Sequence, residues 1–202
     1  MRTLVWFEPT DLTKAFRPFE ASSKWRSVLS YATPNLNELK VMHGAILGKD
    51  IPTTAGHAGN LDVVLQESLN YGVPLIGDHL HTLLVTLGAQ GVLLITNLPS
   101  GAPFPTTLTP TTKNSFVRAV HYPALKMEQI VSVSGAGDCF AAGMIASILQ
   151  GLGPEACIQC GQRAATFSLA SHLAVPHTIN EKAIFSSLEE DTVPIAARSI
   201  FP

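Results

Sequence analysis

The amino-acid sequence predicts an α/β domain built on a largely parallel β-sheet. Short apolar runs alternate with helical patterns of about ten to fifteen residues, which is typical of this class. The chain has 202 residues, and 46% of them are hydrophobic while only 14% are charged. Because charged residues usually make up about a quarter of a protein, this composition implies extensive burial, an interface between chains, or both. The length suits one domain.

The first half of the chain predicts helices that follow short extended pieces. The apolar runs 4–7 and 73–76 favour buried strands, and 31–33 is a brief extended piece before Pro34. A helix is expected over 22–29, capped by Ser22 or Ser23. Two further helices are expected: one opens at Asn35 with Leu39, Met42 and Ile46 on one face, and one runs over 61–71 between Asn60 and Gly72. Residues 48–59 read as a loop.

The second half of the chain begins with a predicted hairpin. Residues 82–87 and 92–96 are β-branched apolar runs joined by a turn at 88–91. Residues 97–114 are rich in Pro, Thr and Gly and predict an excursion loop, after which 116–121 alternates like a strand. Helices are expected from Asp138 to Gly151, from Pro154 through Leu169, and over 179–188 with Asn180 as cap, before an irregular tail from residue 191.

The most informative stretch is 131–152, around which the rest of the chain is organised. The alternating residues 130–134 suit a strand end, and Gly135-Ala136-Gly137 then makes a tight turn into the helix that opens at Asp138. Small residues at such a junction let backbone N–H groups converge at the positive end of a helix, which favours an anion site. Asp138 is then explained as a general base beside an anion hole. The alternative, with about equal weight, is a simple turn followed by a helix-start acid.

Three predicted strand exits carry polar or glycine-bearing turns. They are Thr33/Pro34, Leu87/Gly88 and Ser134/Gly135. Ligands of parallel α/β sheets lie beyond the carboxyl ends of the strands, so we expect the three turns to face one crevice.

Several other functions are excluded or disfavoured. A Rossmann fingerprint would need a glycine at Phe140, and no Walker sequence occurs. The net charge of −2 argues against a nucleic-acid polymer as partner. No apolar run is long enough to span a membrane and the N-terminus does not resemble a signal peptide, so a cytosolic protein is expected. The pair Cys157 and Cys160 is better read as buried thiols than as a zinc or redox site, and metal binding at His79 and His81 is a weaker guess.

Three motifs together resemble the PfkB, or ribokinase-like, family of carbohydrate and nucleoside kinases. The stretch 132–143 resembles the family's C-terminal signature, 33–38 resembles its Asn-x-x-Glu motif, and 85–91 resembles its nucleotide-side strand and turn, in the family's order. The fragment 7–15 is similar to a strand exit of pseudouridine kinases. The resemblance implies a three-layer α/β/α fold and phosphoryl transfer from ATP to a hydroxyl of a sugar or nucleoside.

The resemblance also implies a role for each matching residue. Asp138 would deprotonate the acceptor hydroxyl, and the backbone N–H groups of Gly135, Ala136 and Gly137 would hold the transferring phosphoryl group. Asn35 and Glu38 would act on Mg²⁺ and the phosphates, Glu38 through water. The ATP site would be lined by Thr86, Gly88 and Gly91, with the helix 155–172 flanking the adenine. Ser132 stands where many members have the Asp that helps to bind a monovalent cation, so potassium activation is in doubt.

The resemblance covers nearly all of the chain but only the C-terminal, ATP-binding part of the family's fold. Residues 1–202 match neither the family's Gly-Gly signature nor its sugar-contacting acid and lid strands. Two functions therefore stay open: an ATP-dependent kinase, and a catalytically silent form that acts as a nucleotide-binding or interaction module. The acceptor is also open among pseudouridine, ribose, adenosine and fructose phosphates. An uncovered strand 4–7 would favour self-association of the chain.

Overall fold

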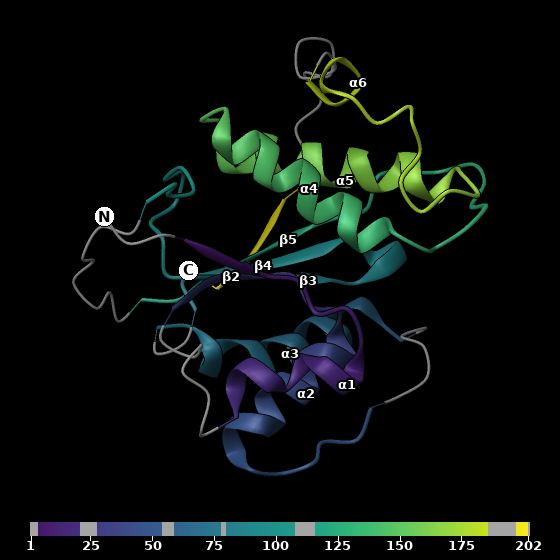
Figure 1. Cartoon of the computed structure of the whole chain (residues 1–202). Helices are drawn as coiled ribbons and strands as arrows, with labels where there is room; N and C mark the ends of the chain where they lie inside the picture. The colour runs from purple at the N-terminus through teal and green to yellow at the C-terminus, as the bar shows by residue number, and fades with distance from the viewer. Residues whose placement is uncertain are drawn as a thin grey trace. The chain divides into compact units, whose positions relative to one another are not determined.

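A computed structural model of the chain describes residues 4–20, 28–53, 59–77, 80–107, 116–185 and 197–201. These residues belong to two compact units, which are described separately (Figure 1). The first unit draws on Met1–Leu98, Thr107–His121 and Arg198–Pro202, and the second on Pro99–Thr106 and Tyr122–Ala197. Within the described ranges, no helix is both long and apolar enough to cross a membrane.

The described strands form one sheet in the order of the chain. They are β1 (Val5–Phe7), β2 (Leu29–Ala32), β3 (Thr82–Thr86), β4 (Val92–Thr96), β5 (Arg118–Tyr122) and β6 (Arg198–Phe201). β2 runs parallel to β1 and β3, whereas β3 with β4 and β5 with β6 are antiparallel. The α/β class is confirmed, and the sheet is mixed, because the short turn between β3 and β4 cannot carry the crossover that parallel strands need.

The first unit packs helices against this sheet. They are α1 (Leu12–Ala15), α2 (Leu36–Leu47) and α3 (Leu61–Gly72), and Figure 1 shows α2 and α3 on one face of the sheet. Leu36, Leu39 and Met42 of α2 are fully buried in a core shared with β3 and α3. α3 ends close against the sheet, since a Cβ on Gly72 would lie 2.5 Å from Cδ1 of Ile95. The predicted helices at Asn35 and Asn60 are therefore confirmed.

The second unit contains a closely packed helix pair, α4 (Ala136–Leu149) and α5 (Pro154–Leu169), followed by the short α6 (Glu181–Phe185). α4 and α5 approach each other through glycines. A Cβ on Gly143 would lie 2.7 Å from the Cys160 carbonyl oxygen, and one on Gly161 would lie 2.8 Å from Cγ of Met144. Helices that touch at glycines in this way tolerate no added methyl group without moving apart.

All three cysteines are buried free thiols, which confirms the expectation for Cys157 and Cys160. Burial raises the pKa of all three, and the pKa of Cys160 reaches about 11, to which the neighbouring Cys157 contributes. A thiol with a raised pKa is a poor nucleophile and a poor metal ligand at neutral pH, which disfavours zinc or redox chemistry here.

Several predicted elements differ in the structure. Residues 73–76 are a 3₁₀ turn (Val73–Leu75) instead of a strand, because Pro74 has no N–H to give to a sheet and suits the start of a helix. Residues 130–134 are not a strand, since the N–H groups of Val131 and Ser132 donate to the Leu169 carbonyl at the end of α5. The tail is not wholly irregular, because Arg198–Phe201 is β6. α4 begins at Ala136, two residues before Asp138.

The predicted helix 22–29 is wrong at its C-terminal end, where Leu29 begins β2. Val28 lies in a turn, and residues 22–27 lie outside the described residues, as does 186–188 of the last helix. α1 was not predicted; Asp11 caps it by accepting a hydrogen bond from Thr13 N at 2.7 Å. A helix of only four residues leaves too short a periodic pattern to be recognised.

Candidate active site

The start of α2 is closed by a reciprocal pair of hydrogen bonds. Glu38 N donates to Oδ1 of Asn35 at 3.0 Å, and Asn35 N donates to Oε2 of Glu38 at 2.8 Å. This capping box satisfies two backbone N–H groups and fixes both side chains at the mouth of the helix. Asn35 is exposed, whereas Glu38 is only 7% exposed. Glu38 therefore acts as a helix-start acid, which is one of the roles that the sequence allowed for it.

Glu38 is also the buried acid of this part of the site. Burial raises its pKa above the ordinary value of 4.5, and the charge of Asp11 raises it further, against the lowering effect of the hydrogen bond from Asn35 N. A bound cation would stabilise the Glu38 carboxylate and lower this pKa again. Mg²⁺ bound with a nucleotide needs only one or two carboxylates in addition to phosphate oxygens and water. Asn35 and Glu38 fit such a site by their oxygen chemistry.

Thr86 lies next to this helix start. Asn35 and Thr86 form an isolated parallel bridge, and Thr86 N donates to the Pro34 carbonyl at 2.9 Å. Asn35, Glu38 and Thr86 are therefore brought together at the carboxyl end of the parallel strands β2 and β3. Two of the three predicted strand exits, Thr33/Pro34 and Leu87/Gly88, lie at this edge.

The turn after β3 holds the other two glycines of the predicted nucleotide site. Gly88–Gln90 is a 3₁₀ turn, Gly88 and Gly91 have φ of 58° and 95°, and Leu87 N donates to the Gly91 carbonyl at 2.8 Å. His121 of β5 contacts the turn, with Nε2 2.6 Å from the Gln90 carbonyl oxygen. Positive φ at both ends of the turn explains why glycine is required at these positions.

A second acid at this edge was not assigned a role from the sequence. Glu8 follows β1 and accepts a hydrogen bond from the Thr33 hydroxyl, which itself accepts one from Nε1 of Trp6 at 3.0 Å. The Trp6 ring stacks on Tyr31 of β2 with centroids 5.0 Å apart. Thr33 is 2% exposed, so this network holds Glu8 at the exit of β1. The sequence signal that could have identified Glu8 was its position directly after the apolar run 4–7.

The start of α4 differs from that of α2. Gly135 is its N-cap with φ of 82°, and no side chain caps the helix. The first regular hydrogen bond of the helix runs from Cys139 N to the Gly135 carbonyl at 2.9 Å. Ala136 N lies 3.5 Å from the Val133 carbonyl oxygen, which makes a long hydrogen bond. Asp138 is exposed in the first turn. A helix start without a side-chain cap presents N–H groups and a positive dipole to an anion, with the Asp138 carboxylate beside them.

Gly135 cannot be replaced by another residue without rearrangement. A Cβ built on it would lie 2.3 Å from the Ala174 carbonyl oxygen. The turn is therefore held close against the segment that follows α5. Gly135, Ala136, Gly137 and Asp138 all belong to the second unit, and Asn35, Glu38, Thr86, Gly88 and Gly91 to the first.

One buried polar group of the second unit was also missed from the sequence. Gln162 of α5 is 6% exposed; its Nε2 donates to the Pro123 carbonyl at 2.8 Å, while Oε1 is buried without a hydrogen-bond partner. A buried acceptor without a donor is unusual in proteins. The sequence offered only a glutamine inside an apolar helical pattern, which does not reveal burial.

The metal guess at the histidines receives no support. Burial lowers the pKa of His81, and His79 lies outside the described residues. Across the ranges that the structure describes, no group of three or more His, Cys, Asp or Glu side chains is placed to hold a metal ion.

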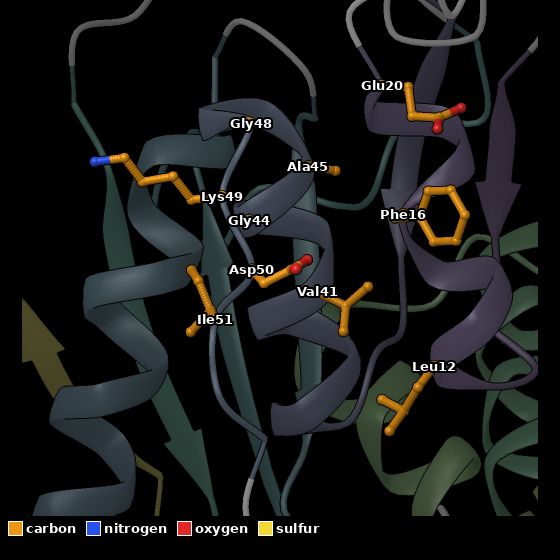
Figure 2. Close-up of a pocket in the computed structure, with 10 residues that line it drawn as sticks. All are labelled: Leu12, Phe16, Glu20, Val41, Gly44, Ala45, Gly48, Lys49, Asp50 and Ile51. Atoms are coloured by element: carbon orange, nitrogen blue, oxygen red, sulfur yellow. The ribbon is translucent and has the colours of Figure 1, made fainter.

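A separate groove of about 700 Å³ lies on the first unit, between α2 and the segment that contains α1 (Figure 2). Leu12, Phe16 and Val41 supply apolar side chains to its lining, and Glu20 and Asp50 supply carboxylates. None of the predicted site residues lines this groove.

Comparisons with known proteins agree with the motifs. Residues 8–180 match the pfkB family carbohydrate kinase. A pseudouridine kinase of Arabidopsis thaliana is 26% identical over 199 residues, which cover 85% of this chain and 51% of that protein. The chain thus spans about half the length of this curated relative.

Solved structures show the same fold at low identity. A nucleoside kinase of Methanocaldococcus jannaschii aligns with a TM-score of 0.59 at 17% identity, over 93% of this chain and 48% of that one. A ribokinase of Thermotoga maritima aligns with a TM-score of 0.55 at 19% identity, over 93% and 57%. A ribokinase of Cryptococcus neoformans, solved with ADP, aligns with a TM-score of 0.55 at 18% identity, over 85% and 49%. The fold is ribokinase-like, and the match over 8–180 shows that the chain belongs to the pfkB family of carbohydrate kinases.

Proposed function

We propose that this chain supplies the nucleotide-binding and phosphoryl-transfer residues of a kinase. The kinase would move the terminal phosphoryl group of ATP to a hydroxyl of a sugar or nucleoside, with a pseudouridine-like nucleoside as the first candidate. The observation that carries the proposal is the start of α4, where a glycine cap leaves the first-turn N–H groups without a side-chain partner and an exposed Asp138 stands beside them. The family membership and the pseudouridine kinase relative support the same reaction.

In this reaction Asp138 takes the proton of the acceptor hydroxyl while the oxygen of that hydroxyl attacks the terminal phosphorus of ATP. The bond from that phosphorus to the bridging oxygen breaks, and ADP leaves. The N–H groups of Gly135, Ala136 and Gly137 stabilise the negative charge on the phosphoryl oxygens during the transfer. Because the positive end of the α4 dipole adds to these donors, little reorganisation is needed when the charge develops.

Thr86, Gly88 and Gly91 are proposed to line the nucleotide site, and Asn35 and Glu38 to hold a magnesium ion with the phosphates. Such an ion neutralises phosphate charge during phosphoryl transfer. Support comes from the contact of Asn35 with Thr86 and from the capping box that orients Glu38. Ser132 offers no carboxylate for a monovalent cation, so we expect turnover without a potassium requirement.

A second candidate function is nucleotide binding without turnover. It is favoured because the residues assigned above would act on the nucleotide, the metal ion or the proton of the acceptor, and none is assigned to hold the acceptor in place. To separate the two, ATP with Mg²⁺ is titrated into the purified chain by calorimetry, and ADP release is then followed with pseudouridine, ribose or adenosine as acceptor. Acceptor-dependent ADP release supports the kinase, binding without release supports the second candidate, and absence of binding contradicts both.

We also propose that the chain self-associates through β1. β1 is the terminal strand of the described sheet, its three residues are only partly buried, and few charges protect the edge. Light scattering of the purified chain should show species larger than a monomer, whose share falls as the protein is diluted. A stable monomer at micromolar concentration would refute this part of the proposal.

A further inference from the structure

A buried serine hydroxyl ties the turn before α4 to the end of α5. Ser168 lies in the last turn of α5 and is fully buried. Its Oγ is 3.0 Å from the Ser134 carbonyl oxygen and 2.8 Å from the Ala174 carbonyl oxygen. Because one hydroxyl has one proton, this proton is shared between two segments that are far apart in the sequence.

Neighbouring hydrogen bonds strengthen the same connection. The Leu169 carbonyl accepts from Val131 N at 2.8 Å and from Ser132 N at 3.3 Å, and Sγ of Cys139 donates to the Ala174 carbonyl at 3.4 Å. The end of α5 is therefore hydrogen-bonded to the segment 131–134 that precedes α4. Ser168 and Cys139 are buried, whereas Val131 and Ala174 are exposed, so the two buried donors are the part of this connection that water reaches least.

The bond to the Ser134 carbonyl has a directional consequence. Where the chain is described, every peptide bond is trans, and in a planar trans peptide the carbonyl and the following N–H point in opposite directions. When Ser168 holds the Ser134 carbonyl toward α5, the N–H of Gly135 must therefore point away from α5. Gly135 N–H is one of the donors that the proposed function assigns to the phosphoryl group.

We propose that Ser168 is a positioning residue for phosphoryl transfer. It holds the Ser134–Gly135 peptide so that Gly135 N–H faces the transferring phosphoryl group, and it does not touch the substrate itself. This inference rests on the proposed function. Another buried serine of the same unit, Ser147, shows the contrast: its Oγ lies 2.8 Å from the carbonyls of Gly143 and Met144 in its own helix and orients no loop.

The test compares Ser168→Ala with Ser147→Ala in the full chain, since both changes delete a fully buried hydroxyl from a helix. Thermal melting establishes that each variant is folded. The amide signals of Gly135 and Gly137 are then recorded by NMR, together with their shifts on addition of inorganic phosphate, and kcat and KM for ATP are measured. If Ser168→Ala does not fold, Ser168→Cys, which keeps the size and a weak donor, takes its place.

We expect Ser168→Ala to move the Gly135 amide signal, to reduce its response to phosphate and to lower kcat by about 10- to 100-fold with little change in KM for ATP. Ser147→Ala should do none of these things. An unchanged Gly135 amide in Ser168→Ala overturns the proposal, and so does a kcat equal to that of Ser147→Ala. If the wild-type chain has no turnover, the proposed function fails, and the Gly135 amide still decides whether Ser168 orients the turn.

Discussion

α2 and α4 begin in opposite ways, although both starts carry residues of the proposed active site. At α2 the side chains of Asn35 and Glu38 close the helix by hydrogen bonding to each other's backbone N–H. At α4 the cap is a glycine in the left-handed region, and no side chain satisfies the first turn. A capping box turns side-chain oxygens toward the backbone N–H groups of its own helix, whereas an uncapped start leaves such N–H groups open to a ligand. In the proposed active site α2 would contribute side chains, and α4 would contribute main-chain N–H groups together with the Asp138 carboxylate.

The largest effect should come from removing the acid at the open helix start. Asp138→Asn should lower turnover by roughly 10²- to 10⁴-fold, because the general base is lost, and leave ATP affinity nearly unchanged. The matched control is Glu155→Gln, which neutralises the first-turn acid of α5 in the same unit. Steady-state kinetics and calorimetric titration of ATP measure the two effects. Equal turnover in the two variants would mean that Asp138 is not the general base and serves only as an acid at the helix start.

The next effect concerns the glycine cap itself. Gly135→Ala should destabilise the fold by more than Gly151→Ala, although both positions have positive φ, 82° and 73°. An L-residue in this region costs roughly 1–2 kcal/mol at either site. Only at Gly135 does the new methyl group also meet the Ala174 carbonyl, since nothing lies within 4 Å of a Cβ at Gly151. Urea unfolding measures both losses, and equal losses would mean that the turn is not held against the segment after α5.

At the closed helix start, Asn35→Ala should cost about 1 kcal/mol of stability through loss of the cap. Asn70→Ala, at an exposed position inside α3, is the control and should be neutral or slightly stabilising. Chemical denaturation compares the two variants. A loss no larger for Asn35→Ala than for Asn70→Ala would show that the capping box contributes little to stability.

The smallest expected change is in the pH dependence of stability on Glu38→Gln. Because burial raises the pKa of Glu38 above 4.5, the folded protein holds this proton more tightly than the unfolded chain does. Its contribution to stability is fully present below pH 4.5 and is lost as the pH rises through the raised pKa of the folded state. Glutamine can keep the capping box without titrating, so the fall in Tm from acidic to neutral pH should be shallower in this variant.

The same variant tests the magnesium role of Glu38. Glu38→Gln should raise the Mg²⁺ concentration needed for turnover more than it weakens binding of nucleotide without metal. Asp62→Asn, at the exposed first-turn acid of α3, controls for loss of a helix-start charge. An unaltered Mg²⁺ requirement would leave Glu38 with its capping role alone.

Much of the fold could be predicted because its signals are local. The helices at Asn35 and Asn60 carry a side-chain cap directly before an apolar period, and the hairpin β3–β4 has a glycine-bearing turn between two β-branched runs. The contact of Asn35 with Thr86 also followed from the expectation that strand exits share one edge of the sheet. Each of these inferences needed only a few consecutive residues or the rule for parallel strands.

The sequence by itself determined the three family motifs, the glycines at positions of positive φ and the caps of the helices, because these depend on the conformation of neighbouring residues. Only the tertiary structure decided that Arg198–Phe201 pairs with β5 and that 130–134 bonds to the end of α5 instead of joining a sheet. It also decided that Ser168, one of several serines in helical patterns, holds the Ser134 carbonyl. Extended segments and buried hydroxyls take their hydrogen-bond partners from distant parts of the chain, and those partners are set by packing, which the local pattern does not encode.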